Sequence, residues 1–152
     1  MSYTGMIPDG GVVSFTPTVG VANWVLETIA SRMAKVCEVG WGGEAASTTP
    51  MRTRVSRDSA VGTGARTAQT VGKTRPNVEA ANAAFLSSTY ASSQPTIAVA
   101  VLVGKSWNAY GGLFAQFFGP GEELIIIGAA SLECRADLGV GLSSYDTKWN
   151  EE

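Results

Sequence analysis

The chain has 152 residues and a formal net charge of −2, and only 16% of its residues are charged. A typical soluble domain is about 25% charged, so this protein is poor in charge. Its length suits one domain with a real buried core. The chain has no histidine, which removes the commonest general base and metal ligand. This composition gives no support for a cofactor, a metal site or a catalytic residue.

The low charge content bears on what the surface does. Soluble monomers usually carry mixed charge on their surface. A chain with little charge either has a surface poor in charged groups or buries much of that surface against copies of itself. The second interpretation is favoured. No apolar stretch approaches the roughly 18 residues of a membrane span. Residues 1–10 have neither a basic nor an apolar signal region, so no secretory signal is visible.

The N-terminal part of the chain is interrupted by glycine and proline. Residues 1–9 are predicted to form an irregular arm, and residues 10–152 a single domain. A short strand is expected at 11–16. Residues 19–30 fit a helix and a strand about equally well, and the β-rich context favours a strand.

Two further strands have clear side-chain patterns. Residues 32–41 are predicted to form one, and residues 51–57 form another whose apolar side chains alternate with arginine and serine. Cys37 and Cys134 both lie in strand-like runs. We expect two buried thiols rather than a disulfide, because buried cysteine commonly behaves as a small apolar residue.

The middle of the chain is predicted to be a long loop. Residues 58–77 are rich in glycine and basic side chains and hold no large apolar residue beyond valine. Loops of about 20 residues are unusual in compact domains and often functional. A short helix is predicted near 77–86, with Asn77 close to its N-terminal cap.

The second half of the chain, 95–149, is the densest in strands and organises the rest. Every residue of 96–103 is apolar or small, and 124–127 is a second apolar run. Strands of this kind are usually covered on both faces, so both are predicted to be central. The chain therefore reads as an all-β, antiparallel, jelly-roll-like sandwich of about 8–10 strands. It lacks the alternation of strands and helices that α/β folds require.

Charge is distributed unevenly along the chain. Six basic residues lie between positions 52 and 75, where Asp58 is the only acidic residue, and the rest of the chain is net acidic. The basic part of one copy is suited to meet the acidic part of another, whereas a solvated strand face and loop is the plain alternative. Nucleic acid is disfavoured as a partner because the pI is about 5.2. The predicted subunit interface comprises Arg52, Arg54, Arg57, Arg66, Lys73, Arg75, Glu122, Glu123, Glu151 and Glu152.

Enzyme motifs are weak. The glycine clusters at 40–43 and 62–64 match neither a dinucleotide-binding nor a phosphate-binding loop. The Ser-Ser-Thr at 87–89, followed much later by Glu122 and Glu123, resembles the mono-ADP-ribosyltransferase pattern, for which only Arg32 could supply the arginine. The family's Glu-x-Glu is not formed here and its Ser-Thr-Ser order is altered. We predict that the chain is not an enzyme.

Tryptophan suggests an alternative function. The chain has four tryptophans, and Trp41 and Trp107 stand near glycines and predicted turns. An exposed indole can stack on a sugar ring, which would make the protein a carbohydrate-binding or surface-binding module. Packing in a core or an interface is the competing explanation, because aromatic side chains dominate both.

A broader resemblance covers most of the chain. The segments CEVGWGG at 37–43, TPMRTRVSR at 49–57 and GTG at 62–64 are similar to small β-sandwich virion structural proteins, of capsid or decoration type, from bacteriophages and environmental viral genomes. The resemblance implies a structural protein that assembles with copies of itself into a particle, tube or filament, in a virion or another extracellular assembly. It implies no active site and no cofactor.

Overall fold

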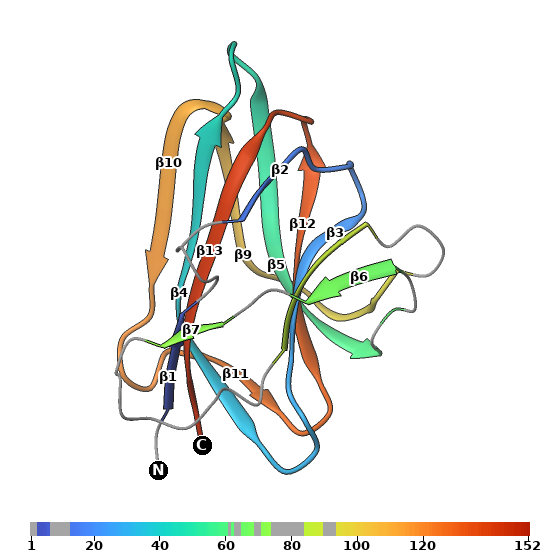
Figure 1. The fold of residues 1–152 in the computed structure, drawn as a ribbon, viewed down its shortest axis with the longest axis vertical. Helices are drawn as coiled ribbons and strands as arrows, with labels where there is room; N and C mark the ends of the chain where they lie inside the picture. Colours follow the sequence, from blue (N-terminus) through green and yellow to red (C-terminus); the bar gives the residue numbers. More distant parts are fainter. Residues whose placement is uncertain are drawn as a thin grey trace.

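The computed structural model describes residues 3–6, 13–60, 62, 65–68, 71–73, 84–89 and 94–152. Within these ranges the chain forms strands only, and every strand pairing is antiparallel (Figure 1). The strands make two sheets that pack against each other. The predicted all-β antiparallel sandwich is therefore confirmed.

Sheet A has the strand order β10-β4-β13-β1-β7, with β11 paired to β4 and β2 paired to β13. Its strands are β1 (Tyr3–Met6), β2 (Val13–Phe15), β4 (Met33–Glu44), β7 (Gly72–Lys73), β10 (Tyr110–Phe117), β11 (Leu124–Ile127) and β13 (Ser143–Glu151). Sheet B has the order β6-β8-β3-β12-β5-β9. Its strands are β3 (Ala22–Glu27), β5 (Pro50–Ala60), β6 (Ala65–Ala68), β8 (Ala84–Thr89), β9 (Thr96–Asn108) and β12 (Ser131–Leu138).

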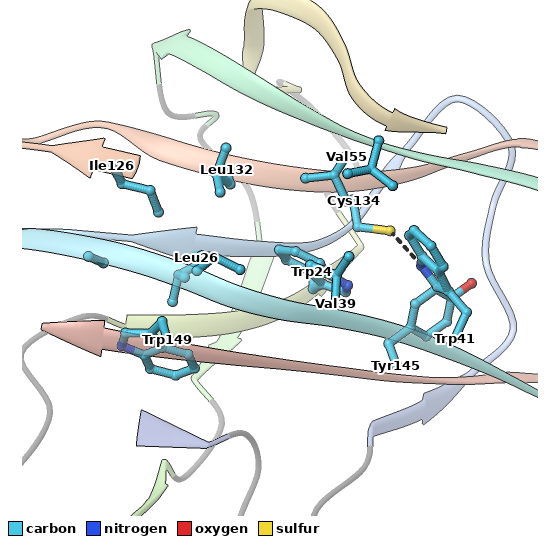
Figure 2. Close-up of a cluster of buried hydrophobic side chains, with 13 residues drawn as sticks. Trp24, Leu26, Val39, Trp41, Val55, Ile126, Leu132, Cys134, Tyr145 and Trp149 are labelled. Carbon is cyan, nitrogen blue, oxygen red and sulfur yellow. Dashed lines mark hydrogen bonds between the residues drawn. The ribbon is translucent and has the colours of Figure 1, made fainter. Parts of the chain in front are cut away.

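The core lies between the sheets and is built around large aromatic side chains. Trp24 of sheet B and Trp41, Tyr145 and Trp149 of sheet A are all fully buried there. The indole Nε1–H of Trp41 donates a hydrogen bond to Sγ of Cys134 over 3.2 Å, so one polar contact joins the two sheets (Figure 2). Both cysteines are free, as expected, and Cys134 is buried whereas Cys37 is half-buried.

The prediction that the apolar runs at 96–103 and 124–127 are central strands is wrong. β9 ends the strand order of sheet B, and β11 pairs with β4 alone. Val101 of β9 is 53% exposed and Ile127 of β11 is 70% exposed. The central strands are instead β4, β13, β12 and β5. In a chain this poor in charge, an apolar run does not distinguish a covered strand from an edge strand.

Three other predictions need correction. Tyr3–Met6 of the expected irregular arm forms β1 and pairs with β13. The expected loop at 58–77 is shorter, because β5 continues to Ala60 and the short strands β6 and β7 form inside it. Of the helix expected near 77–86, residues 84–86 belong to strand β8, and residues 77–83 lie outside the described ranges. Short polar segments of this kind are recruited into sheets by their neighbours, and their own sequences carry little alternation.

Replacing Leu132 with alanine should destabilise the sandwich by about 2–5 kcal/mol, because Leu132 is fully buried in the core and leaves a cavity when truncated. Urea unfolding followed by tryptophan fluorescence measures the change. Leu138→Ala on the same strand is the matched control, since Leu138 is about half exposed and its truncation should change stability by no more than about 0.5 kcal/mol. Equal losses for the two variants would contradict this packing.

Candidate assembly interface

The outer face of sheet A carries an apolar border along β10. In this strand Leu113, Ala115 and Phe117 pair with residues 42, 40 and 38 of β4. The intervening Phe114 points inward and stacks on Trp41, with ring centroids 4.7 Å apart. Because side chains alternate along a strand, Leu113 and Phe117 point outward, and they are 84% and 66% exposed.

Strand β11 continues this border along the same edge of β4. Ile126 is buried, and Ile125 and Ile127 on either side of it pair with Lys35 and Met33 and face outward. Four large apolar side chains thus follow one another down one edge of the sheet. We call them the edge column: Leu113, Phe117, Ile125 and Ile127.

A shallow groove separates the upper part of the edge column from strand β13. Its floor is formed by Gly40 and Gly42, and Leu113, Ser144 and Asp146 stand around it, with a volume of about 280 Å³. A Cβ atom on Gly40 would lie 2.0 Å from Oδ1 of Asp146, so any larger residue at this position requires that carboxylate to move. The cluster Gly40-Trp41-Gly42 is therefore explained by the packing of sheet A.

Charged side chains beside the edge column are paired within the chain. Lys148 forms an ion pair with Glu38 across the β4–β13 ladder, and Nζ of Lys35 lies 2.7 Å from Oε1 of Glu152. The hydrogen bond to Glu38 raises the pKa of Lys148 above its ordinary value, which keeps the ammonium charged. Burial, with Glu38 nearby, raises the pKa of Asp146. This face is therefore an apolar border beside a strip whose opposite charges largely balance.

Two basic residues of the predicted charge interface, Arg54 and Arg57, are engaged in local contacts. Nε of Arg54 lies 3.3 Å from a carboxylate oxygen of Asp137, and the guanidinium of Arg57 donates to the backbone carbonyl of Ile125 over 2.9 Å. Arg52 is exposed on β5. The side chains of Arg66 and Lys73, and the whole of Arg75, lie outside the described part of the structure.

The acidic residues of that interface are dispersed. Glu151 is 1% exposed and accepts a hydrogen bond from the Trp149 indole over 2.9 Å, so its assignment to a subunit interface is wrong. Glu152 pairs with Lys35, and Glu123 accepts from the Gly121 amide over 2.7 Å. Glu122 is exposed in the turn before β11. The described structure does not gather these carboxylates into one acidic patch.

The predicted stacking tryptophans are not exposed rings. Trp41 is buried in the core, so the prediction that it stacks on a ligand is wrong. Trp107 is half-buried, and its indole N–H donates to the hydroxyl of Thr53 over 3.1 Å. Both indoles serve packing, which is the explanation that competed with sugar binding. The glycines beside Trp41 had suggested an exposed turn. In the structure Gly40 and Gly42 lie within β4, and they leave room for side chains of the neighbouring strand β13.

The weak transferase pattern is also scattered over the fold. Arg32 precedes β4 and Glu122 precedes β11, both on sheet A, whereas Ser87 lies in β8 of sheet B. Among the described residues no group of three or more cysteine, aspartate and glutamate side chains is placed to hold a metal ion. No helix in the described ranges is long and apolar enough to cross a membrane.

A buried polar row crosses sheet B and was missed by sequence reasoning. Ser131 pairs with Glu27 on one side and with Asp58 on the other, and its hydroxyl donates to Oδ2 of Asp58 over 2.8 Å. Two residues further along β12, Glu133 is fully buried, and Oε2 of its carboxylate lies 2.6 Å from Nη2 of Arg135. Burial raises the pKa of Asp58 to about 7. In β12 polar residues alternate with apolar ones, and such alternation alone does not show whether the polar face is solvated.

Comparison with known proteins finds no match to this chain: no protein-family model, no curated protein and no solved structure matches it significantly. The resemblance of short motifs to virion structural proteins therefore stays a prediction. The edge column is the described feature that offers the clearest means of interaction with another molecule.

Asp58 should make the stability of the protein depend on pH. Its pKa is about 7 in the folded state and 3.8 as the ordinary value. At pH values between these two pKa values, the Asp58 carboxyl is protonated in the folded protein and ionised in the unfolded chain. The free energy of unfolding should therefore fall as pH rises from 4 to 7, by up to about 1.4 kcal/mol per pH unit, and then level off.

Asp58→Asn should remove this slope, because asparagine can still accept the hydrogen bond of Ser131 but does not titrate. Urea unfolding at several pH values between 4 and 8 measures it. Glu122→Gln, at an exposed site, is the control and should keep the slope of the parent protein. An undiminished slope in Asp58→Asn would show that another group is responsible.

Proposed function

We propose that this chain is a non-enzymatic structural protein that assembles with copies of itself into a particle, tube or filament. The observation that carries the proposal is the edge column. Four large apolar side chains are exposed on one face along an edge of a sheet. Large exposed apolar surfaces are uncommon on monomeric proteins and mark interaction sites.

The size of the edge column fits a moderate contact between copies. Burying a large apolar side chain gains roughly 1.5–3 kcal/mol. Four of them on each copy supply a gain of the same order as the roughly 4–15 kcal/mol that association costs in lost freedom. The internally paired charges next to the column add little repulsion. A contact of this strength gains stability when it is repeated many times in an assembly.

A second exposed apolar surface supports an assembly larger than a pair. The β4–β5, β9–β10 and β12–β13 connections meet at the upper end of the sandwich in Figure 1. Backbone hydrogen bonds hold these loops together, from Glu44 to Leu142 and from Ala45 to Ala109. Closed or extended assemblies of many copies need more than one contact surface. The exposed apolar residues at this end are Tyr110, Leu138, Val140 and Leu142.

The low charge content and the resemblance to virion structural proteins support the same proposal and suggest a virion or another extracellular assembly as its setting. Copies of the chain itself are the proposed partners. Nucleic acid and membranes have no place in this proposal, because the pI is about 5.2 and no apolar span is predicted.

The double variant Leu113→Glu/Phe117→Glu should prevent assembly and leave the fold intact, because both side chains point away from the core. Size-exclusion chromatography with light scattering and negative-stain electron microscopy measure assembly, and circular dichroism checks the fold. The control is Val101→Glu, which places one glutamate at an exposed apolar site on the opposite sheet. A parent protein that is monomeric at high concentration, or a double variant that assembles like the parent, would refute the proposal.

A further inference from the structure

The outer edge of β10 is open. β10 is the terminal strand of sheet A, and it lies at the outer margin of the molecule with no described strand beyond it (Figure 1). Its other edge is fixed to β4, where the amide of Phe118, just after the strand, donates to the carbonyl of Cys37 over 2.9 Å. An open strand edge presents unpaired backbone donors and acceptors to any strand that can align with it.

The ladder to β4 determines which backbone groups face outward. In an antiparallel pair, alternate residues direct both their N–H and C=O groups to the same neighbour. Because Phe118 is bonded to β4, Phe114 and Gln116 are bonded to it as well. The N–H and C=O groups of Leu113, Ala115 and Phe117 therefore point to the open edge. The Phe117 carbonyl accepts a hydrogen bond from the side-chain amide of Gln116 over 3.1 Å, and it has to share that bond or release it when a second strand pairs there. The same three residues carry the outward side chains of the strand.

This edge is self-complementary about Ala115. If two copies of β10 align antiparallel with Ala115 opposite the partner's Ala115, Leu113 lies opposite the partner's Phe117, and the reverse pair forms as well. Each of the three pairs can exchange two backbone hydrogen bonds, about six in all. Each leucine–phenylalanine pair continues the apolar border from one copy to the next. The small side chain of alanine occupies the crowded position on the axis.

The start of the strand sets the limit of the pairing. Gly111 has a positive φ of 65°, and the register with β4 shifts between Tyr110 and Leu113. The regular edge therefore spans 113–117, centred on Ala115. Residues 110–117 contain no charged residue and no proline, the two devices that usually protect an edge strand from pairing.

We propose, resting on the proposed self-assembly, that two copies of this chain join through antiparallel pairing of their β10 edges about a two-fold axis at Ala115. The two copies of sheet A then form one continuous sheet. A two-fold contact uses the edge of both copies and closes. It makes the dimer the building block, and further assembly proceeds through other surfaces.

Cysteine cross-linking tests the register directly. The variants Leu113→Cys and Phe117→Cys are made in a Cys37→Ser background, which removes the half-buried native thiol and keeps a hydrogen-bond donor to the Lys148 carbonyl. In the proposed register residue 113 lies about 5.5 Å, between Cα atoms, from the partner's residue 117. This distance is within the range of a disulfide, about 4.4–6.8 Å.

Mixing the two variants and oxidising them with copper phenanthroline should give a covalent heterodimer. Either variant alone should give none, because residue 113 lies about 14 Å from the partner's residue 113. The variant Ala115→Cys should by contrast cross-link to itself. Each protein alone serves as the control for the mixture, since it has the same thiol, background and oxidant.

A backbone variant gives an independent measurement. Ala115→Pro removes an N–H that points to the open edge and leaves the bonds to β4 in place, and edge strands tolerate proline in that orientation. It should abolish dimerisation, as measured by light scattering, with an unchanged circular dichroism spectrum. A folded Ala115→Pro protein that dimerises like the parent would overturn the proposal.

The results separate this proposal from the proposed function. If the parent assembles but the Leu113→Cys and Phe117→Cys mixture gives no more covalent dimer than either protein alone, the register is wrong and self-assembly still holds. If the parent is monomeric at high concentration and no variant cross-links, both fail. Selective cross-linking of the mixture, with self-cross-linking of Ala115→Cys, supports both.

Discussion

One irregularity in β4 determines which side chains of sheet A reach the core. Across the pairing with β13, Lys148 is opposite Glu38 but Trp149 is opposite Val36, so Cys37 is an extra residue in β4. Ala34 and Val36 before this bulge and Val39 and Trp41 after it all face the core. A strict alternation of two would have turned one of these sets outward.

The same bulge explains how two short strands share one edge of β4. β10 pairs with 38–44 and β11 with 33–36, and the chain leaves the sheet between them beside Cys37. The bulge at Cys37 reverses which residues of β4 face outward, and the strands paired to β4 on either side of it shift their alternation in the same way. Consequently the outward residues of β10 and β11 fall on the same face although they belong to different strands. The edge column therefore depends on a backbone feature of the neighbouring strand.

The sequence allowed the fold class to be predicted, and also strands with clean alternation. In β5, Met51, Thr53 and Val55 are buried as expected, because a half-buried strand has a side-chain period of two. Whether a strand is central or at an edge depends on which strands pair with it. The alternation of its own side chains does not carry that information. β12 shows that alternation does not report exposure either, since Glu133 alternates with apolar residues and is nevertheless fully buried. Its carboxylate is paired with the guanidinium of Arg135.

In the interface predicted from charge, the assignment of Glu151 is wrong because its side chain is buried, and other members are paired within the chain. Charge counted along the sequence does not distinguish contacts within a copy from contacts between copies. Antiparallel pairing of β13 with β4 brings Glu152 to Lys35, residues that are far apart in the chain, and so pairs within one molecule a carboxylate that had been assigned to the interface. The edge column could have been suspected from Leu113 and Phe117, which alternate over a strand without charge. Their exposure became visible only once Phe114 was seen to stack on Trp41.

β9 and β10 each end the order of one sheet, and they differ in how they meet solvent although a single turn joins them. β9 carries the exposed Lys105, and its register with β5 shifts repeatedly, features that hinder the approach of a second strand. β10 has neither between 113 and 117, where its pairing with β4 is regular. The same molecule thus protects one open edge and leaves the other straight, uncharged and apolar. An open edge with these properties is prone to aggregation unless a specific partner covers it, and in the proposed dimer the second copy is that partner.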